Sequence, residues 1–316
     1  MSKKFLSIVS FLFAGMFISS CGDNTEEVYN PFDEEKTGEF ISTSVTIDKS
    51  TDNLTECEKW TDIVMDSANK VHQYKYSYQY NKADGDVKRE NKTCKIYYSK
   101  DHTGKNIITT RTSLEYFQEL KGIQKEYTQQ LEEDITLDNN GRIVNITTKT
   151  FHYDKGATEP ALRTSERSFT YYNDFCTSST YSDETSQITY TYNWNAYQLT
   201  GITVLKNKHI DGVIEHDRYE YKYDNRLYPY SGTELMPFIQ RGLPEIFASM
   251  GYFGKCTPYI LLEEKHNGEI KYNSSNSTTT TTTTVNKYSF SDDINFEMRY
   301  SALSNIYKTL DIVFKK

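Results

Sequence analysis

The chain has 316 residues, a formal net charge of −8 and only 36% hydrophobic residues, yet it contains 27 tyrosines and is 14% aromatic. The acidic balance disfavours nucleic acid and anionic lipid headgroups as partners, because like charges repel. So large an aromatic share argues against a disordered chain and is typical of β-sheets whose faces are partly covered.

The first twenty residues have the pattern of an export signal. Two lysines precede an apolar stretch, residues 5–18, which is too short to span a bilayer as a helix. The segment from Ile18 to Cys21 then resembles the lipobox of bacterial lipoproteins. This resemblance implies that residues 1–20 are a signal peptide and that Cys21 carries acyl chains such as palmitate. The chain would then be an outer membrane lipoprotein of the cell envelope, with its domain in the periplasm or on the cell surface.

Residues 21–40 are polar and acidic without hydrophobic periodicity, which predicts a flexible tether ahead of a β-sheet domain at residues 41–316. Acidic residues directly after the lipidated cysteine resemble the surface-export signal of Bacteroidetes lipoproteins, although a solvated linker accounts for them equally well. If the chain comes from that phylum, Asp66-Ser67-Ala68 matches its O-glycosylation pattern, which makes Ser67 a candidate modification site.

Alternation of aromatic and polar residues predicts antiparallel strands over most of the domain. Residues 71–80 alternate, Asp84-Gly85 marks a turn, and residues 87–98 alternate back. Residues 112–131 fit two structures, because they begin with a helix capping box and also alternate as a hairpin that turns at Lys121-Gly122.

Residues 202–224 predict a second hairpin with a definite register. A two-residue turn at Asp211-Gly212 brings opposite charges and apolar residues together on one face, which we expect to be exposed. The expected pairs are Ile210 with Val213, Lys208 with Glu215, Lys206 with Asp217 and Val204 with Tyr219.

Two segments depart from the strand pattern. Residues 244–250 predict a short amphipathic helix that begins at Pro244, ends before Gly251 and packs on a sheet or in the end of a barrel. Seven consecutive threonines, residues 278–284, predict either a disordered loop tip or an exposed strand edge.

A loose unit recurs at residues 137–146, 192–202 and 223–230, where Asp or Asn at a tight turn precedes β-branched or aromatic positions. These units resemble the YD-type hairpins of bacterial surface proteins, and the chain resembles uncharacterised Bacteroidetes lipoproteins with a porin-like β domain of unknown function. The resemblance implies a mainly β fold, an antiparallel meander that forms a curved sheet or an open or closed barrel. It also favours the hairpin over residues 112–131. It assigns no catalytic or binding residues.

Besides Cys21 there are four widely spaced cysteines, which excludes a clustered zinc site. An exported chain permits disulfides, and three pairings are open, as are buried thiols. The four are Cys57, Cys94, Cys176 and Cys256.

Familiar catalytic signatures are absent from the sequence, including glycine loops for phosphate, metalloprotease helices and nucleophile elbows. His209 and His216 share one face of the second hairpin beside Asn207, but no third ligand accompanies them. We therefore predict no catalytic residues, no cofactor and no metal.

The tyrosine stripes are the remaining candidate for function. They either stabilise a sheet that lacks a thick aliphatic core or form an aromatic platform for sugars or apolar ligands. Their recurrence along the chain favours the structural role. The candidate platform residues are Tyr74, Tyr76, Tyr78, Tyr80, Tyr190, Tyr192 and Trp194.

These features predict a lipid-anchored envelope protein that acts as a binding or scaffold module without catalysis, with a glycan or an envelope protein as partner. Two alternatives remain open: a carrier that holds a lipid or another apolar ligand in a barrel, and a hydrolase that acts on polysaccharides. Tyrosine stripes that face inward would favour a ligand inside the sheet.

Overall fold

The computed structural model describes residues 42–51, 54–66, 70–209, 212–227, 242–271, 280–289, 296–302 and 307–314. All of them belong to one compact unit, residues 36–316. The signal peptide, the tether, Cys21 and Ser67 lie outside the described residues, so the predictions made for them stay predictions.

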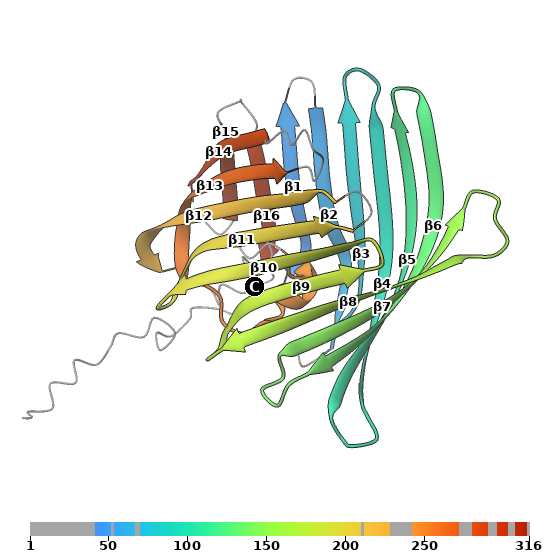
Figure 1. Ribbon diagram of the computed structural model, residues 1–316, viewed down its shortest axis with the longest axis horizontal. Helices are drawn as coiled ribbons and strands as arrows, with labels where there is room; N and C mark the ends of the chain where they lie inside the picture. Colours follow the sequence, from blue (N-terminus) through green and yellow to red (C-terminus); the bar gives the residue numbers. More distant parts are fainter. Residues whose placement is uncertain are drawn as a thin grey trace, which may run out of the picture. The chain divides into compact units, whose positions relative to one another are not determined.

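The described residues are almost entirely β-strands (Figure 1). In chain order these are β1 (Ser42–Thr51), β2 (Leu54–Met65), β3 (Val71–Lys82), β4 (Val87–Lys100), β5 (Asn106–Leu120), β6 (Ile123–Leu137), β7 (Ile143–Asp154), β8 (Ala161–Tyr172), β9 (Phe175–Asp183), β10 (Ser186–Asn195), β11 (Gln198–Lys208), β12 (Ile214–Leu227), β13 (Tyr259–Lys271), β14 (Thr280–Ser289), β15 (Phe296–Ala302) and β16 (Tyr307–Phe314).

Each strand pairs with its neighbours in sequence, and β1 also pairs antiparallel with β16, which closes the meander into a barrel. Figure 1 shows β1 to β6 running side by side, with β8 to β13 crossing at a steep angle to them. Closure leaves no free edge strand in this sheet. The predicted mainly β, antiparallel meander is therefore confirmed, in its closed form.

Alternating burial along the strands shows which face points inward. On β6, Ile135 and Leu137 are 1% and 6% exposed. Asp134, which precedes Ile135, and Thr136, which lies between the two, are both exposed. Successive side chains of a strand point to opposite faces, so the apolar positions form a core inside the ring. The largest fully buried side chains on the strands are Ile96, Ile108, Ile135, Ile143, Leu199 and Ile202.

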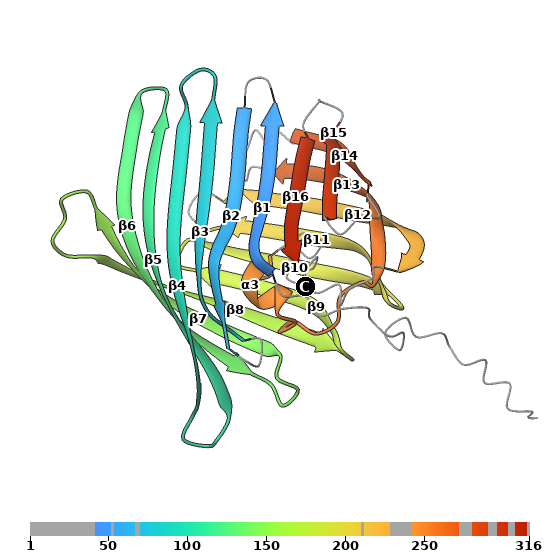
Figure 2. The same cartoon turned by 180° about the vertical axis from the view of Figure 1, so that it is seen from behind.

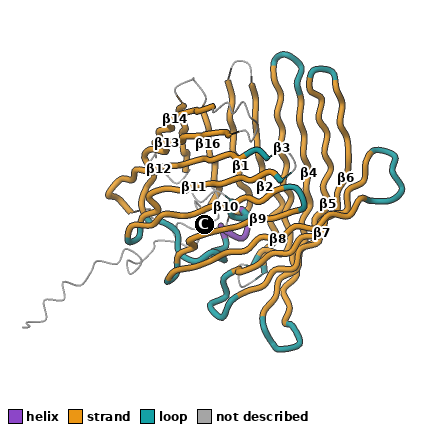
Figure 3. The backbone as a smooth tube through the Cα atoms, in the orientation of Figure 1, coloured by secondary structure: helices purple, strands orange, loops and turns teal. Residues whose placement is uncertain are grey.

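The segment 242–258 enters the barrel between β12 and β13 and carries the helix α3 (Glu245–Ser249), which Figures 2 and 3 show within the ring of strands. Phe247, Ala248 and Phe253 of this plug are 3%, 0% and 0% exposed. The predicted helix is confirmed, although Pro244 caps it rather than forming its first turn. None of the helical residues that the structure describes form a segment with the length and hydropathy of a membrane span.

Tight turns with positive φ confirm the hairpins predicted in the first half of the domain. Gly85 has φ +96 between β3 and β4. Lys121 and Gly122 have φ +50 and +76, and Leu120 pairs with Ile123, as in a two-residue turn with both central residues left-handed. Residues 112–131 are therefore a hairpin, and the helical alternative is wrong.

The predicted register of the β11–β12 hairpin is wrong by two residues. Lys206 pairs with Glu215, Val204 with Asp217 and Ile202 with Tyr219. An even shift keeps every side chain on its predicted face, since the strand period is two. The face itself points inward, because Val204 on it is 2% exposed, so the expectation of an exposed face is also wrong.

A longer connection causes this shift. The N–H of Gly212 donates to the Lys208 carbonyl at 3.1 Å, and the N–H of Lys208 donates to the Val213 carbonyl at 3.0 Å. His209 leaves the ladder because its N–H donates to the Thr185 carbonyl at 2.8 Å. Ile210 and Asp211 are outside the described residues. The contact of His209 with the β9–β10 turn thus goes with a connection longer than the predicted two-residue turn.

The recurring units have different structures. Residues 137–146 contain a turn with Gly141 at φ +80, and residues 192–202 contain a turn with Ala196 at φ +48. The tight turn expected after Tyr223 is wrong, because residues 223–227 continue β12 with an irregular register. Of the threonine run, residues 280–284 pair with β13 as part of β14, which confirms the strand alternative for them.

The cysteines lie on different elements, with Cys94 on β4, Cys176 on β9 and Cys256 in the plug. Cys94 and Cys176 are buried thiols at 2% and 0% exposure, and the thiol of Cys256 donates to the Thr257 carbonyl at 3.3 Å. Burial raises the pKa of the Cys176 thiol to about 12 and raises that of Cys94 as well. Neutral thiols of this kind behave as small core side chains, which supports the buried-thiol alternative.

Candidate functional site

The inner face of β4 changes from apolar to polar along the strand. Ile96 and Cys94 are buried on it, and Lys92, Glu90 and Lys88 follow at every second position toward the β3–β4 turn. Alternation places all five side chains on the inner face. The polar three are partly exposed, so this end of the barrel presents chemical groups that the packed core does not use.

Cross-strand pairing extends this change into rows over β2 to β7. One row consists of Trp60, Tyr76, Lys92, Leu114, Gln129 and His152. The next row toward the turns consists of Glu58, Tyr78, Glu90, Tyr116, Tyr127 and Asp154. We call the four partly buried tyrosines of these rows, Tyr76, Tyr78, Tyr116 and Tyr127, the tyrosine wall.

Ring contacts fix the tyrosine wall in place. Tyr116 and Tyr127 stack with their centroids 4.4 Å apart and an interplanar angle of 15°. The ring of Tyr127 also lies 4.6 Å from His152, and Tyr76 lies 5.1 Å from Trp60. Such pairs add to the energy of area burial and restrict ring rotation. The wall is therefore a prearranged surface.

Two lysines of β4 lie over these rings. Lys92 Nζ is 4.8 Å from the centroid of Tyr76 and 2.6 Å from Glu90 Oε1. Lys88 Nζ is 4.9 Å from the centroid of Tyr78 and 5.5 Å from that of Tyr116. All three centroid distances fit cation–π attraction, which orients the ammonium groups along the wall.

The phenol groups of the wall are neutral hydrogen-bond donors. Tyr76 donates to Glu58 Oε2 and Tyr78 donates to Glu56 Oε1, each at 3.4 Å. Burial and the Glu56 carboxylate raise the pKa of Tyr78 far above its usual range. A phenol beside a carboxylate keeps its proton because a phenolate would be repelled.

The structure divides the predicted platform residues into two places. Tyr74, Tyr76, Tyr78 and Tyr80 do line the inner face of β3. Tyr116 and Tyr127, which complete the wall, were not singled out by the sequence. They could have been found from the predicted turn at Lys121-Gly122, because a two-residue turn there places Tyr116 opposite Tyr127.

The β10 stripe belongs to the core instead. Tyr192 is 3% exposed, and the Trp194 indole N–H donates to the Cys176 carbonyl at 2.8 Å. The ring of Tyr190 lies against Gly242 of the plug so closely that a Cβ there would come within 2.6 Å of it. Tyr190 therefore contacts the plug, Tyr192 and Trp194 pack in the core, and the wall of β3 to β6 is left as the candidate site.

A second polar cluster lies on the inner face of β11 to β13. Lys206 Nζ is 3.2 Å from Glu215 and 3.1 Å from Asp217, and Lys208 Nζ is 2.6 Å from Glu215. His266 Nε2 lies 2.9 Å from Asp217. The hydrogen bond from Lys208 is the largest cause of the lowered pKa of Glu215. Because these charges neutralise one another, the cluster is self-contained.

Charged residues also lie midway along the outer face. Arg111 and Glu132 face outward on β5 and β6 with a closest approach of 3.6 Å, and their side chains are 72% and 50% exposed. Lys149 and Glu166 are exposed at the middle of β7 and β8. On β12, Arg218 lies 3.2 Å from Glu220. The outer face therefore carries charged side chains midway along its strands, together with single exposed apolar ones such as Leu205 and Ile214.

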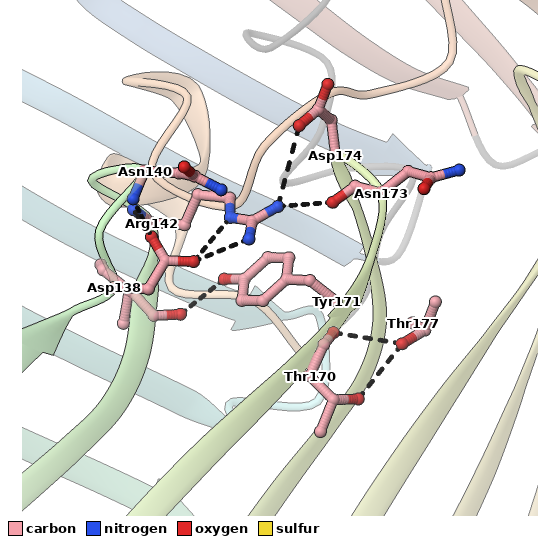
Figure 4. Close-up of polar contacts among 9 residues, drawn as sticks. Asp138, Asn140, Arg142, Thr170, Tyr171, Asn173, Asp174 and Thr177 are labelled. Atoms are coloured by element: carbon pink, nitrogen blue, oxygen red, sulfur yellow. Dashed lines mark hydrogen bonds and ion pairs between the residues drawn. The ribbon is translucent and has the colours of Figure 1, made fainter.

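Arg142 ties the plugged end of the barrel together (Figure 4). Its guanidinium donates to Asp138 Oδ2 at 2.8 Å and to the Asn173 carbonyl at 2.6 Å, and it lies 4.4 Å from the ring centroid of Tyr171. Asp174 then accepts an N–H from Lys255 of the plug at 2.8 Å. The unit at residues 137–146 is therefore a structural clamp.

Metal ligands do not cluster in the part of the chain that the structure describes, since it contains no group of three His, Cys, Asp or Glu side chains placed to hold an ion. His216 is exposed on the outer face opposite Leu205, and His209 is in the β11–β12 connection. They therefore lie apart from the tyrosine wall.

Comparisons with known proteins give little beyond the fold. No protein-family model matches the chain, and no curated protein sequence matches it. Among solved structures, a porin-like protein from Bacteroides uniformis is similar, with a TM-score of 0.48 and 11% sequence identity over 88% of this chain and 98% of that chain. At this level the likeness assigns no residue a role, so the function rests on the site itself.

Proposed function

We propose that the chain is an envelope-anchored protein whose barrel binds an oligosaccharide on the tyrosine wall. The observation that carries this proposal is the set of partly exposed phenols, carboxylates, amides and ammonium groups on the inner face of β2 to β6. Sugar hydroxyls both donate and accept hydrogen bonds, and pyranose rings pack on aromatic side chains. The β11–β13 cluster also contains a stacked ring pair, Tyr219 and His266 at 4.4 Å, but its lysines and carboxylates already pair with one another.

The apolar inner face favours this ligand over a lipid. Phe253 of the plug packs on Phe169 with ring centroids 4.8 Å apart, and both are buried. The plug therefore already covers the apolar floor that an acyl chain would need. We place the carrier function second for this reason.

The outer face supports binding in water rather than passage through a bilayer. Arg111, Lys149 and Arg218 lie on outward positions of β5, β7 and β12. A lysine or arginine facing hydrocarbon near the bilayer centre costs roughly 2–4 kcal/mol. An outer face with these charges is suited to an aqueous compartment, and the lipid anchor would attach the protein to the membrane.

The test of this function is an array of envelope and dietary oligosaccharides probed with the purified full chain. Tyr116→Ala removes the ring that contacts both Tyr127 and Lys88, and we expect it to weaken binding about tenfold. Tyr97→Ala is the matched control, because Tyr97 lies on the outer face of β4 and is 46% exposed. Circular dichroism melts of both variants confirm that the barrel is folded.

Three outcomes separate the alternatives. Equal binding by wild type and Tyr116→Ala would place the ligand elsewhere, and a wild-type chain that captures no oligosaccharide would refute the proposal. Mass spectrometry of the bound sugars shows whether they are cleaved. Cleavage would favour the polysaccharide hydrolase, which the array alone does not distinguish from a binder.

Anchoring depends on Cys21 in this proposal. We expect Cys21→Ala to abolish palmitate labelling and to leave a precursor that retains residues 1–20, because the acyl acceptor is lost. Cys57→Ala is the control, since it removes a cysteine beyond the signal segment. Normal labelling of Cys21→Ala would contradict the lipoprotein assignment while leaving the glycan site untouched.

A further inference from the structure

The ammonium group of Lys88 makes cation–π contacts with two phenol rings. Its Nζ lies over Tyr78 and Tyr116, at 4.9 and 5.5 Å from their centroids, and no carboxylate of the described residues is within ion-pair distance of it. Lys92, four residues along β4, differs because Glu90 accepts a hydrogen bond from it at 2.6 Å. The charge of Lys88 is thus available to a ligand.

The row that contains Lys88 includes Glu56 of β2 and Tyr80 of β3 on one side, and donors on the side of β5 and β6. Lys88 pairs with Gln118 of β5, and Gln118 pairs with Lys125 of β6. Lys125 Nζ lies 5.4 Å from the centroid of Tyr127, again without a carboxylate among the described residues. Gln118 Oε1 accepts from Tyr116 at 2.6 Å, which leaves its amide N–H groups to donate. We call Lys88, Gln118 and Lys125 the donor row.

We propose that the donor row binds the acidic groups of the ligand, so that the oligosaccharide carries uronate or sulfate groups. This inference rests on the proposed function and names its substrate class. The donor row directly borders the tyrosine wall, so one sugar chain can contact both. The lysine ammonium is a compact point charge and lacks the planar two-donor geometry of the arginine guanidinium. It can therefore donate hydrogen bonds to a carboxylate or to a sulfate equally well.

Charge balance across the inner face supports this assignment. The lysines of the β11–β13 cluster are neutralised by Glu215 and Asp217, and Lys92 is neutralised by Glu90. Lys88 and Lys125 have no such carboxylate partner among the described residues. An anionic ligand would pair with Lys88 as Glu90 pairs with Lys92.

The experiment is calorimetric titration of the full chain with trigalacturonate and with its neutral methyl ester. A second pair, a sulfated galactose oligosaccharide and its desulfated form, distinguishes sulfate from carboxylate as the acidic group. We expect Lys88→Met to bind the acidic member about tenfold more weakly, with the neutral member unchanged. Lys88→Arg should retain most of the affinity. Lys95→Met, an exposed lysine on the outer face of β4, is the control.

Salt gives a second readout that does not depend on folding differences. Wild-type affinity for the acidic sugar should fall as sodium chloride is raised, and the Lys88→Met, Lys125→Met double variant should lose this dependence. Equal affinity of the wild type for acidic and neutral sugars, with Tyr116→Ala still weakening both, would overturn this inference and leave the proposed function intact. Absence of binding to every sugar would overturn both.

Discussion

Gly254→Ala is expected to destabilise the barrel by about 3 kcal/mol or more, through backbone strain and overpacking together. Gly254 has φ +81, and a Cβ there would lie 2.1 Å from the carbonyl oxygen of Asp174. Main chain cannot yield as a flexible side chain does, so the plug must move away from the β8–β9 turn. Urea unfolding of the purified chain measures the loss.

Gly104→Ala is the matched control for this prediction. Gly104 has φ +83, nearly that of Gly254, but a Cβ there would meet no atom within 4 Å. It reports backbone strain alone, which we expect to cost about 1 kcal/mol. Equal losses in the two variants would show that the contact with Asp174 does not constrain the plug.

Arg142→Met is expected to cost about 2–3 kcal/mol, because it leaves a largely buried carboxylate without its partner. The side chains of Arg142 and Asp138 are only 15% and 21% exposed. Arg111→Met is the control, since Arg111 is 72% exposed and its surface pair with Glu132 contributes little. A loss no larger than that of the control would show that the clamp is not needed for stability.

The same variant has a pH signature. Burial alone would raise the pKa of Asp138, but hydrogen bonds from the main chain and side chain of Arg142 hold this pKa below its usual range. A lowered carboxyl pKa contributes stability above the ordinary value of roughly 4, and this stability is lost as pH falls through the folded-state value. The difference in unfolding free energy between wild type and Arg142→Met should therefore shrink as the solution becomes more acidic.

Local patterns predicted the hairpins well, because each turn depends on a few adjacent residues. Lys121 and Gly122 both adopt positive φ, and the alternation on either side fits a strand. The β11–β12 register failed because the His209 N–H bonds to Thr185, in a turn outside that hairpin. No local pattern contains this contact.

The candidate site was harder to predict than the strands. Alternation shows that Tyr76 and Tyr78 share a face, but it does not show whether that face points inward, which depends on ring closure. The wall also needs Tyr116 and Tyr127 from a second hairpin, and their alignment with β3 follows from pairing across β4. The charged face of β11 and β12 was wrongly predicted to be exposed for the same reason, because its lysines and carboxylates pair inside the barrel.

The pairing of β1 with β16 has a consequence for how the chain reaches its native state. Every other pairing in the ring joins strands that follow one another in sequence, over connections far shorter than the whole meander, whose loop entropy closure must overcome. Until β16 docks, β1 and β15 each present unpaired N–H and carbonyl groups that can capture strands of other molecules. The delay before this docking step sets how long the nascent protein is prone to aggregate.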